Sequence, residues 1–430
     1  MRTLIKISRN YLIFWIILII GTILRISVMF NAYHGDLNNN ISWGKLAYER
    51  GLNDFYGSSS AEDWPYSAPN QPPLTILTFA MTRSLYVGIG NLFSNLNNTI
   101  GLFPSKLIWF WEEKGMILLI KLPSILADLA IGLVIYGYLK RLSNKFNGLI
   151  GFAVWILNPI SWYNSSIWGQ TDSIVNLLGF LSILFLLKKK LPLSALFITL
   201  SVLFKGSLMV FIPMIFFVAI KQRYPISEWL KSGLIAFIAI FVTCIWFHPN
   251  WDVFLWIINL YKTRILPGEI GYLTAGAFNL WWLVNPGKIP DSQMLYGLNM
   301  RLIGMAITLF SGAIVIIEML RSKFQAKLFW LSLILLSMSA FLFMTRMHGR
   351  YLYPAFIPLT IYSVLNKKSF IFLIILSLTF FLNMYWGFWY PGNTLLEEAL
   401  KSGRLAGILS LVNLVLYFLF FQKYLTSDDK

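Results

Sequence analysis

The chain has 430 residues, of which 57% are apolar, 17% aromatic and only 12% charged, and its formal net charge is +17. Soluble domains contain about 25% charged residues, so this composition excludes a soluble globular domain and indicates a protein of many membrane-spanning helices. The single cysteine, Cys244, excludes a disulfide within the chain and any metal site built from several cysteines.

Basic residues recur in short clusters between apolar segments. The clusters are Arg2/Lys6/Arg9, Lys140/Arg141/Lys145, 188–190, Lys221/Arg223/Lys231, Arg321/Lys323/Lys327, Lys367/Lys368 and Lys423/Lys430. Cytoplasmic loops of membrane proteins are enriched in lysine and arginine in this way. We therefore expect the positive charge to set the membrane topology and not to bind nucleic acid.

Placing every basic cluster in the cytoplasm predicts twelve spans with both termini inside. The predicted spans are 11–30, 116–139, 147–163, 172–188, 191–205, 207–221, 231–247, 295–320, 328–345, 352–366, 369–387 and 404–421. Several are short for a hydrocarbon core of about 30 Å. The pair on either side of Lys205 therefore predicts a cavity at membrane level. We expect one all-α membrane domain over residues 1–430, with the first span kept as an anchor.

Two long segments fall on the external side of this topology, residues 31–115 and 248–294. Within the first, residues 74–93 are apolar but follow Pro72-Pro73 and contain Arg83. If they crossed the membrane, every later basic cluster would move outside. We therefore expect an interfacial or re-entrant helix there.

Asp36 is the candidate catalytic residue. It lies in the sequence His34-Gly35-Asp36, shortly after the first span, so the predicted topology places its carboxylate just outside the membrane. A carboxylate held there could act as a general base. The cytoplasmic loops are short, and the sequence has no Gly-rich phosphate motif, GxSxG or HExxH. The candidate chemistry therefore lies on the external face.

Six motifs follow one another in a characteristic order. They are Gly35-Asp36, Gln71-Pro72-Pro73-Leu74, Ala127-Asp128-Leu129, Trp168-Gly169-Gln170-Thr171-Asp172, Lys205 and His348-Gly349-Arg350-Tyr351. In this order and topology, over most of residues 20–365, the sequence resembles the GT-C superfamily of polyprenyl-phosphate-sugar-dependent glycosyltransferases. The nearest resemblance is to the dolichyl-phosphate-glucose glucosyltransferases of N-glycan assembly and to the second mannosyltransferase of GPI-anchor assembly. Gly349 replaces the family's usual Glu, and Gln71 its usual Tyr.

The resemblance implies a GT-C fold. It also implies transfer of a hexose from a polyprenyl phosphate to a glycan or glycolipid on the extracytoplasmic face of a membrane. In a prokaryote, that membrane would be the plasma membrane. The resemblance further implies that Asp36 is the general base and that transfer inverts the anomeric carbon. Cations must neutralise the leaving phosphate. The candidates for phosphate binding are Lys205, Arg350, His348 and Arg264. The candidates for lining the substrate site are His34, Gln170, Asp172, Trp168, Glu269 and Tyr351. We expect no required metal and no other cofactor.

Structural alternatives exist for several of these residues. Asp36 and Asp172 could be helix caps, Lys205 could extend to the interface, and Arg25 and Asp128 could pair within the spans. Two other functions stay open, a transporter or flippase of lipid-linked sugars and a protein O-mannosyl- or oligosaccharyltransferase. Transporters often show internal repeats and the protein-directed transferases a large extra external domain, and the sequence shows neither feature.

Overall fold

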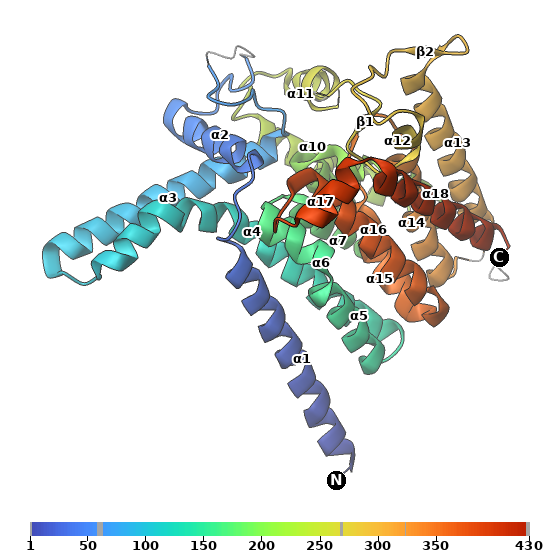
Figure 1. Ribbon diagram of the computed structural model, residues 1–430, viewed down its shortest axis with the longest axis horizontal. Helices are drawn as coiled ribbons and strands as arrows, with labels where there is room; N and C mark the ends of the chain where they lie inside the picture. The colour runs from blue at the N-terminus through green and yellow to red at the C-terminus, as the bar shows by residue number, and fades with distance from the viewer. Residues whose placement is uncertain (1, 58–62, 267–269, 323, 427–430) are drawn as a thin grey trace.

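The computed structural model describes residues 2–57, 63–266, 270–322 and 324–426, and it consists almost entirely of helices (Figure 1). Eight helices in this described part are long and apolar enough to cross a membrane. This confirms an all-α membrane protein. The number of crossings and the GT-C fold stay predictions.

Each predicted span coincides with helix. Seven of them correspond to long helices: α1 (Arg2–Val28), α4 (Ser105–Leu142), α10 (Ile226–Cys244), α13 (Met300–Arg321), α14 (Ala326–Phe343), α16 (Phe370–Phe388) and α18 (Arg404–Leu425). The other five are shorter: α5 (Lys145–Leu157), α7 (Asp172–Leu187), α8 (Leu191–Phe204), α9 (Ile212–Lys221) and α15 (Phe356–Leu365). A short 3₁₀ helix, η2 (Gly206–Phe211), precedes α9. The predicted short pair around Lys205 therefore consists of α8 on one side and η2 with α9 on the other.

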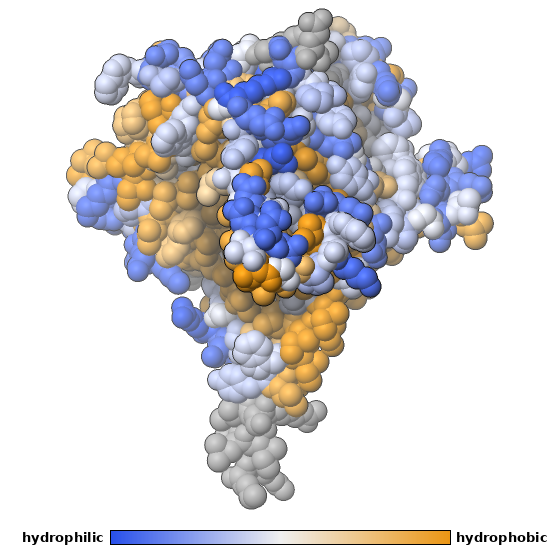
Figure 2. Space-filling view, turned by 90° about the vertical axis from the view of Figure 1, so that its left-hand side faces the viewer, coloured by the Kyte–Doolittle hydropathy of each residue, from blue (hydrophilic) through white to orange (hydrophobic). Residues whose placement is uncertain are grey.

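Helix α14 forms the centre of the core. It is apolar on all sides, as expected for a helix surrounded by others, and nearly all of its residues are buried. Helices α13, α15 and α18 pack around it. The outer helix α1 differs, because Tyr11, Leu12, Trp15, Ile19 and Ile23 are each more than half exposed. Figure 2 shows hydrophilic residues gathered at the upper end and hydrophobic residues over much of the flank below, which fits a lipid-facing surface.

A long hairpin projects sideways from the body (Figure 1). It consists of α3 (Pro73–Ile100) and the first half of α4, which pack together through stacked Tyr86 and Trp111. The 38 residues of α4 extend about 57 Å at 1.5 Å per residue, far more than a hydrocarbon core of about 30 Å. The predicted start of a span at residue 116 is therefore not a helix start. The helix already begins at Ser105, inside the predicted external loop 31–115.

The second predicted external loop, 248–294, contains two short helices, α11 (Val253–Leu260) and α12 (Leu280–Val284), with the π-helical turn η3 (Tyr261–Ile265) after α11. Its strand β1 (Thr274–Ala275) pairs in parallel with β4 (Met347–His348). Strands β2 (Met294–Leu295) and β3 (Leu298–Asn299) form a small antiparallel pair at the loop's end.

One ion pair fastens this loop to the segment after α14. Arg346 contacts both carboxylate oxygens of Asp291, at 2.7 and 2.9 Å, and Asp291 is almost fully buried. Bidentate pairs of this kind fix geometry as well as charge. The pair and the β1–β4 contact together hold residues 346–350 in place.

Arg25 and Asp128 pair inside the helices, as expected for a structural role. Arg25 Nε donates to Asp128 Oδ2 at 2.8 Å, and both side chains are fully buried. Asp128 also accepts hydrogen bonds from Trp155 and Ser165. Every charge in this pair is therefore compensated locally, which is what a buried ion pair requires.

Candidate functional site

Asp36 stands at the start of α2 (Asp36–Arg50), directly after the link from α1. Its side chain is 35% exposed. Oδ2 accepts hydrogen bonds from Gln170 Nε2 at 2.7 Å and from Arg350 Nη1 at 3.2 Å. The N-cap residue of α2 is Gly35, and the backbone N–H of Asp36 donates to His34 Nδ1 at 3.0 Å. The carboxylate is thus part of a polar cluster and is not a helix cap.

An unusual turn positions Gln170. After the short helix α6 (Pro159–Trp162), the chain forms a π-helix, η1 (Tyr163–Trp168), and leaves it through Gly169 with φ at +75°. This left-handed conformation favours glycine. Wide π-helical turns are rare and often occur at functional sites. The turn brings Gln170 to Asp36, while every residue of η1 is buried.

Lys205 lies where the backbone becomes extended between α8 and η2. Its side chain is 10% exposed, and Nζ donates to Asp172 Oδ1 at 2.5 Å. Asp172 Oδ2 accepts from Asn164 at 3.3 Å. Lys205 is therefore held by Asp172 in a nearly buried ion pair, and Asp172 takes part in the polar cluster as well as beginning α7.

Arg350 links the two carboxylates. Its Nη1 contacts Asp36, and its Nε lies 4.0 Å from Asp172 Oδ2. The guanidinium carbon lies 5.2 Å from the centre of the Trp168 ring and 5.9 Å from that of Tyr351, distances typical of cation–π contacts. Lys205 Nζ lies 5.4 Å from the same Tyr351 ring. Two carboxylates and two cations thus alternate across the site.

Aromatic rings pack together beside these charged groups. Trp168 is fully buried, and its ring centre lies 5.2 Å from that of His34, 5.7 Å from His348 and 5.9 Å from Phe388. Trp168 Nε1 and His348 Nδ1 are buried without a hydrogen-bond partner in the described part of the chain. Two donor or acceptor positions beside the charged cluster are thus available to a polar ligand or water.

The surroundings set the charge of each group. Burial acts to raise the pKa of Asp36, but the contact with His34 and the charge of Arg350 together hold it well below its usual range. Burial and the nearby Arg350 lower the pKa of His348. Burial acts to lower the pKa of Arg350. The negative charge of nearby Asp36 outweighs burial, so the pKa of Arg350 is raised. At neutral pH, Asp36 is therefore ionised, Arg350 is charged and His348 is neutral.

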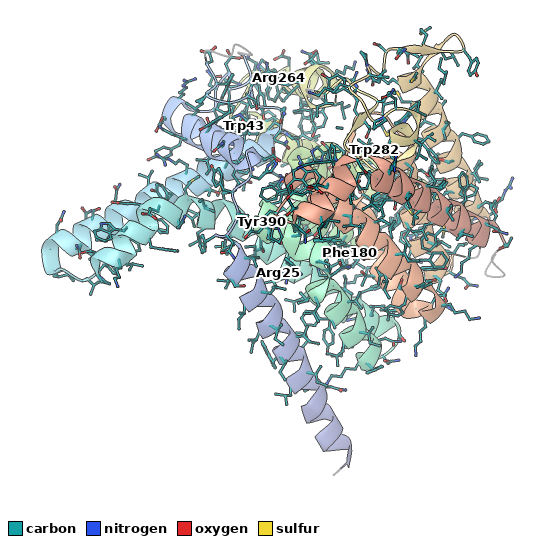
Figure 3. All side chains as sticks on the ribbon, in the orientation of Figure 1. Arg25, Trp43, Phe180, Arg264, Trp282 and Tyr390 are labelled. Carbon is teal, nitrogen blue, oxygen red and sulfur yellow. The ribbon has the colours of Figure 1, made fainter. Side chains whose placement is uncertain are left out.

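The structure thus brings together nine of the eleven predicted site residues: Asp36, Lys205, Arg350, His348, His34, Gln170, Asp172, Trp168 and Tyr351. Arg264 lies in η3, and Figure 3 shows it in the upper layer of the molecule, apart from Tyr390, whose ring packs on Phe388 at the edge of the site. Glu269 lies outside the described residues. Sequence reasoning missed Lys121, a buried lysine next to the Gln170 turn whose only sequence signal is a charge inside an apolar segment.

In the described ranges, no group of three or more His, Cys, Asp or Glu side chains could hold a metal ion. The expectation that no metal is required stays a prediction.

No model of a known protein family matches the chain. No curated protein matches it either. Any functional assignment therefore rests on the order of the motifs and on the geometry of the site.

Proposed function

We propose that this protein transfers a hexose from a polyprenyl phosphate to a hydroxyl group of a glycan or glycolipid acceptor on the extracytoplasmic face. The observation that carries the proposal is the contact between Asp36 and Arg350. It places an ionised, partly exposed carboxylate beside a largely buried cation, and Asp172 lies between that cation and Lys205. This reaction needs such a pair, a base for the acceptor and a cation for the leaving group.

The reaction is a single displacement. The acceptor oxygen attacks the anomeric carbon as its proton passes to the Asp36 carboxylate. The bond between that carbon and the phosphate oxygen breaks, and its electron pair stays on the phosphate. Arg350 and Lys205 stabilise the added negative charge. Attack opposite the leaving group inverts the configuration, and the proton then passes from Asp36 to water.

Donor binding changes the partners of both cations. Without a donor, Asp36 and Asp172 compensate Arg350 and Lys205. A donor phosphate would compete with these carboxylates for the same N–H groups. When Arg350 moves toward the phosphate, one of the influences that lower the pKa of Asp36 weakens, so Asp36 becomes a stronger base. The geometry therefore favours base action only when the donor is bound.

The short helices around Lys205 support a lipid-linked donor. Helix α8 has 14 residues and α9 has 10, which at 1.5 Å per residue give about 21 and 15 Å. Neither alone matches a core of about 30 Å. Such short helices on both sides of Lys205 support a site at membrane level, which a phosphate attached to a prenyl chain could approach from the lipid.

Mass spectrometry of cell-envelope glycolipids tests the proposal. Cells that lack the protein should accumulate a glycolipid one hexose shorter, and the wild-type gene should restore the full-length product. Asp36→Asn should fail to restore it. Glu113→Gln, at an exposed acid on α4, should restore it. Glycolipids of unchanged size but altered sidedness would instead indicate a flippase and would refute the proposal.

A further inference from the structure

Lys121 is a fully buried cation in the middle of α4. Its ammonium donates to three backbone carbonyls, those of Met29 at 2.7 Å, Ala32 at 3.1 Å and Ile167 at 2.9 Å. An ammonium has three donors, so these contacts use all of them. In the described part of the chain, carbonyl groups and no carboxylate compensate its charge.

The three carbonyls belong to the two segments that carry the site. Met29 and Ala32 lie in the short link between the end of α1 and Asp36. Carbonyls at a helix end lack partners within the helix and need an external donor. Ile167 lies near the end of η1, three residues before Gln170. One ammonium therefore joins the backbone that leads to Asp36 to the backbone that presents its hydrogen-bond donor.

The side chain of Lys121 also fits closely against the turn itself. A Cβ atom added at Gly169 would lie 3.0 Å from Lys121 Cε and 3.0 Å from a methyl group of Leu37. Leu37 directly follows Asp36. Leu37 and the alkyl chain of Lys121 therefore both pack against the turn before Gln170.

Packing alone does not explain a charge at this position. Methionine has a similar length and would fill the space without the desolvation of an ion. The chain neutralises another buried cation, Arg25, with the carboxylate of Asp128. Lysines inside apolar helices are costly and usually have a function.

We propose that Lys121 is a positioning residue for the transfer reaction, which fixes the spacing between Asp36 and Gln170. The inference rests on the proposed function, because spacing matters to catalysis only if Asp36 is the base. Loss of the three carbonyl contacts lets the two segments shift relative to one another. Misplacement of a catalytic group by about 1 Å can cost about 100-fold in rate.

Steady-state kinetics of Lys121→Met in nanodiscs test the proposal. We expect kcat to fall between about 10-fold and 100-fold, while the donor KM changes less than about threefold because Arg350 and Lys205 remain. Lys106→Met, at an exposed lysine on the same helix, should behave as wild type. A folded Lys121→Met protein with wild-type kcat would overturn the proposal.

A distance measurement gives a readout that does not depend on activity. Spin labels at Lys45→Cys on α2 and at Ser402→Cys, both exposed positions, report the placement of α2 in a Cys244→Ser background. Lys121→Met should broaden or shift the distance distribution, and an unchanged distribution would contradict the proposal. If wild type shows no transfer, the proposed function fails, and the labels still decide whether Lys121 positions α2.

Lys121→Arg covers the case in which Lys121→Met does not fold. Arginine keeps the cation and its donors but places them differently, so we expect a folded protein with a shifted distribution and a lowered kcat. A lowered kcat with a wild-type distribution would overturn the proposal, because the loss would then not arise from positioning.

Discussion

Arg350 Nη1 lies 3.2 Å from Asp36 Oδ2, so two residues 314 positions apart form one ion pair. The pair joins the start of α2 to the segment that follows α14. With the contact of His34, it keeps the carboxylate ionised, and it places a largely buried cation beside a group that solvent can reach. In the proposed reaction, the donor phosphate takes the place of Asp36 as the partner of Arg350.

We predict that Asp36→Asn abolishes transfer but preserves the fold. Asparagine keeps the size and a hydrogen-bonding group but cannot take the acceptor's proton. Loss of a general base typically lowers the rate about 10²–10⁴-fold. Turnover by the purified protein measures the effect, with melting temperature and donor binding as controls for folding. Turnover within about threefold of wild type would remove Asp36 from the mechanism.

The pairing of Asp36 with Arg350 could be predicted only in part. The charge pattern placed Asp36, Asp172 and Arg350 on one face, and the motif order placed Lys205 near them. Which carboxylate contacts which cation depends on helix packing between distant segments, and no local pattern encodes that. The Lys121 contacts are equally non-local, because they end on backbone carbonyls, which every residue carries.

The same limit applies to the external loops. Apolar composition predicted a helix near residues 74–93, but it could not predict that α3 and α4 would form a long projecting hairpin. Nor could it predict that Arg346 would pair with Asp291, because the two residues are 55 positions apart. Arg264 has the charge expected of a phosphate ligand, but its place in η3 follows from the packing of that loop.

The low pKa of Asp36 predicts a wide pH range of activity. Burial acts to raise the pKa of Asp36, and the contacts with His34 and Arg350 lower it more. In the folded protein the pKa of Asp36 lies below the unfolded value of about 3.9. The folded carboxylate therefore stays ionised as the pH falls past about 3.9. Its stabilising effect is present above the unfolded pKa and is lost only as the pH falls through the folded pKa.

In kinetic terms, kcat/KM of wild type should therefore show no loss from this group between pH 7 and about 5. Arg350→Gln removes one lowering influence and leaves burial, which raises the pKa, so its acid limb should move to higher pH. A wild-type acid limb near pH 6, or no shift in Arg350→Gln, would contradict this assignment.

Gly349 should not tolerate a side chain. A Cβ atom there would lie 2.7 Å from Asn383 Nδ2 and 2.9 Å from the Asn383 backbone oxygen. Asn383 holds the loop through Gly276 and Phe278, so a shift would disturb the β1–β4 contact. We expect Gly349→Ala to destabilise the fold by about 1–3 kcal/mol, as measured by melting temperature.

Gly137→Ala is the matched control for this change. Gly137 lies within α4, and a Cβ atom there would meet nothing within 4 Å. Its replacement should leave stability equal or slightly higher, by up to about 1 kcal/mol. If Gly349→Ala were as stable as Gly137→Ala, residue 349 would not be sterically restricted.

The topology predicts opposite sides for two positions. Cysteine introduced at Asn97, at the end of α3, should react with a membrane-impermeant reagent added outside the cell. Cysteine introduced at Lys188, after α7, should react only after the membrane is opened. Both variants carry Cys244→Ser, which removes the native cysteine. Labelling of both positions from the same side would refute the twelve-span arrangement with an external α3–α4 hairpin.

Transfer from a defined donor tests the central claim most directly. Purified protein in nanodiscs, given a synthetic polyprenyl phosphate that carries a radiolabelled hexose and an extract of acceptor glycolipids, should form a labelled glycolipid with inverted anomeric configuration. UDP- and GDP-linked hexoses should yield no product without a lipid carrier. Transfer from a nucleotide sugar in the absence of polyprenyl phosphate would contradict both the proposed donor and the GT-C resemblance.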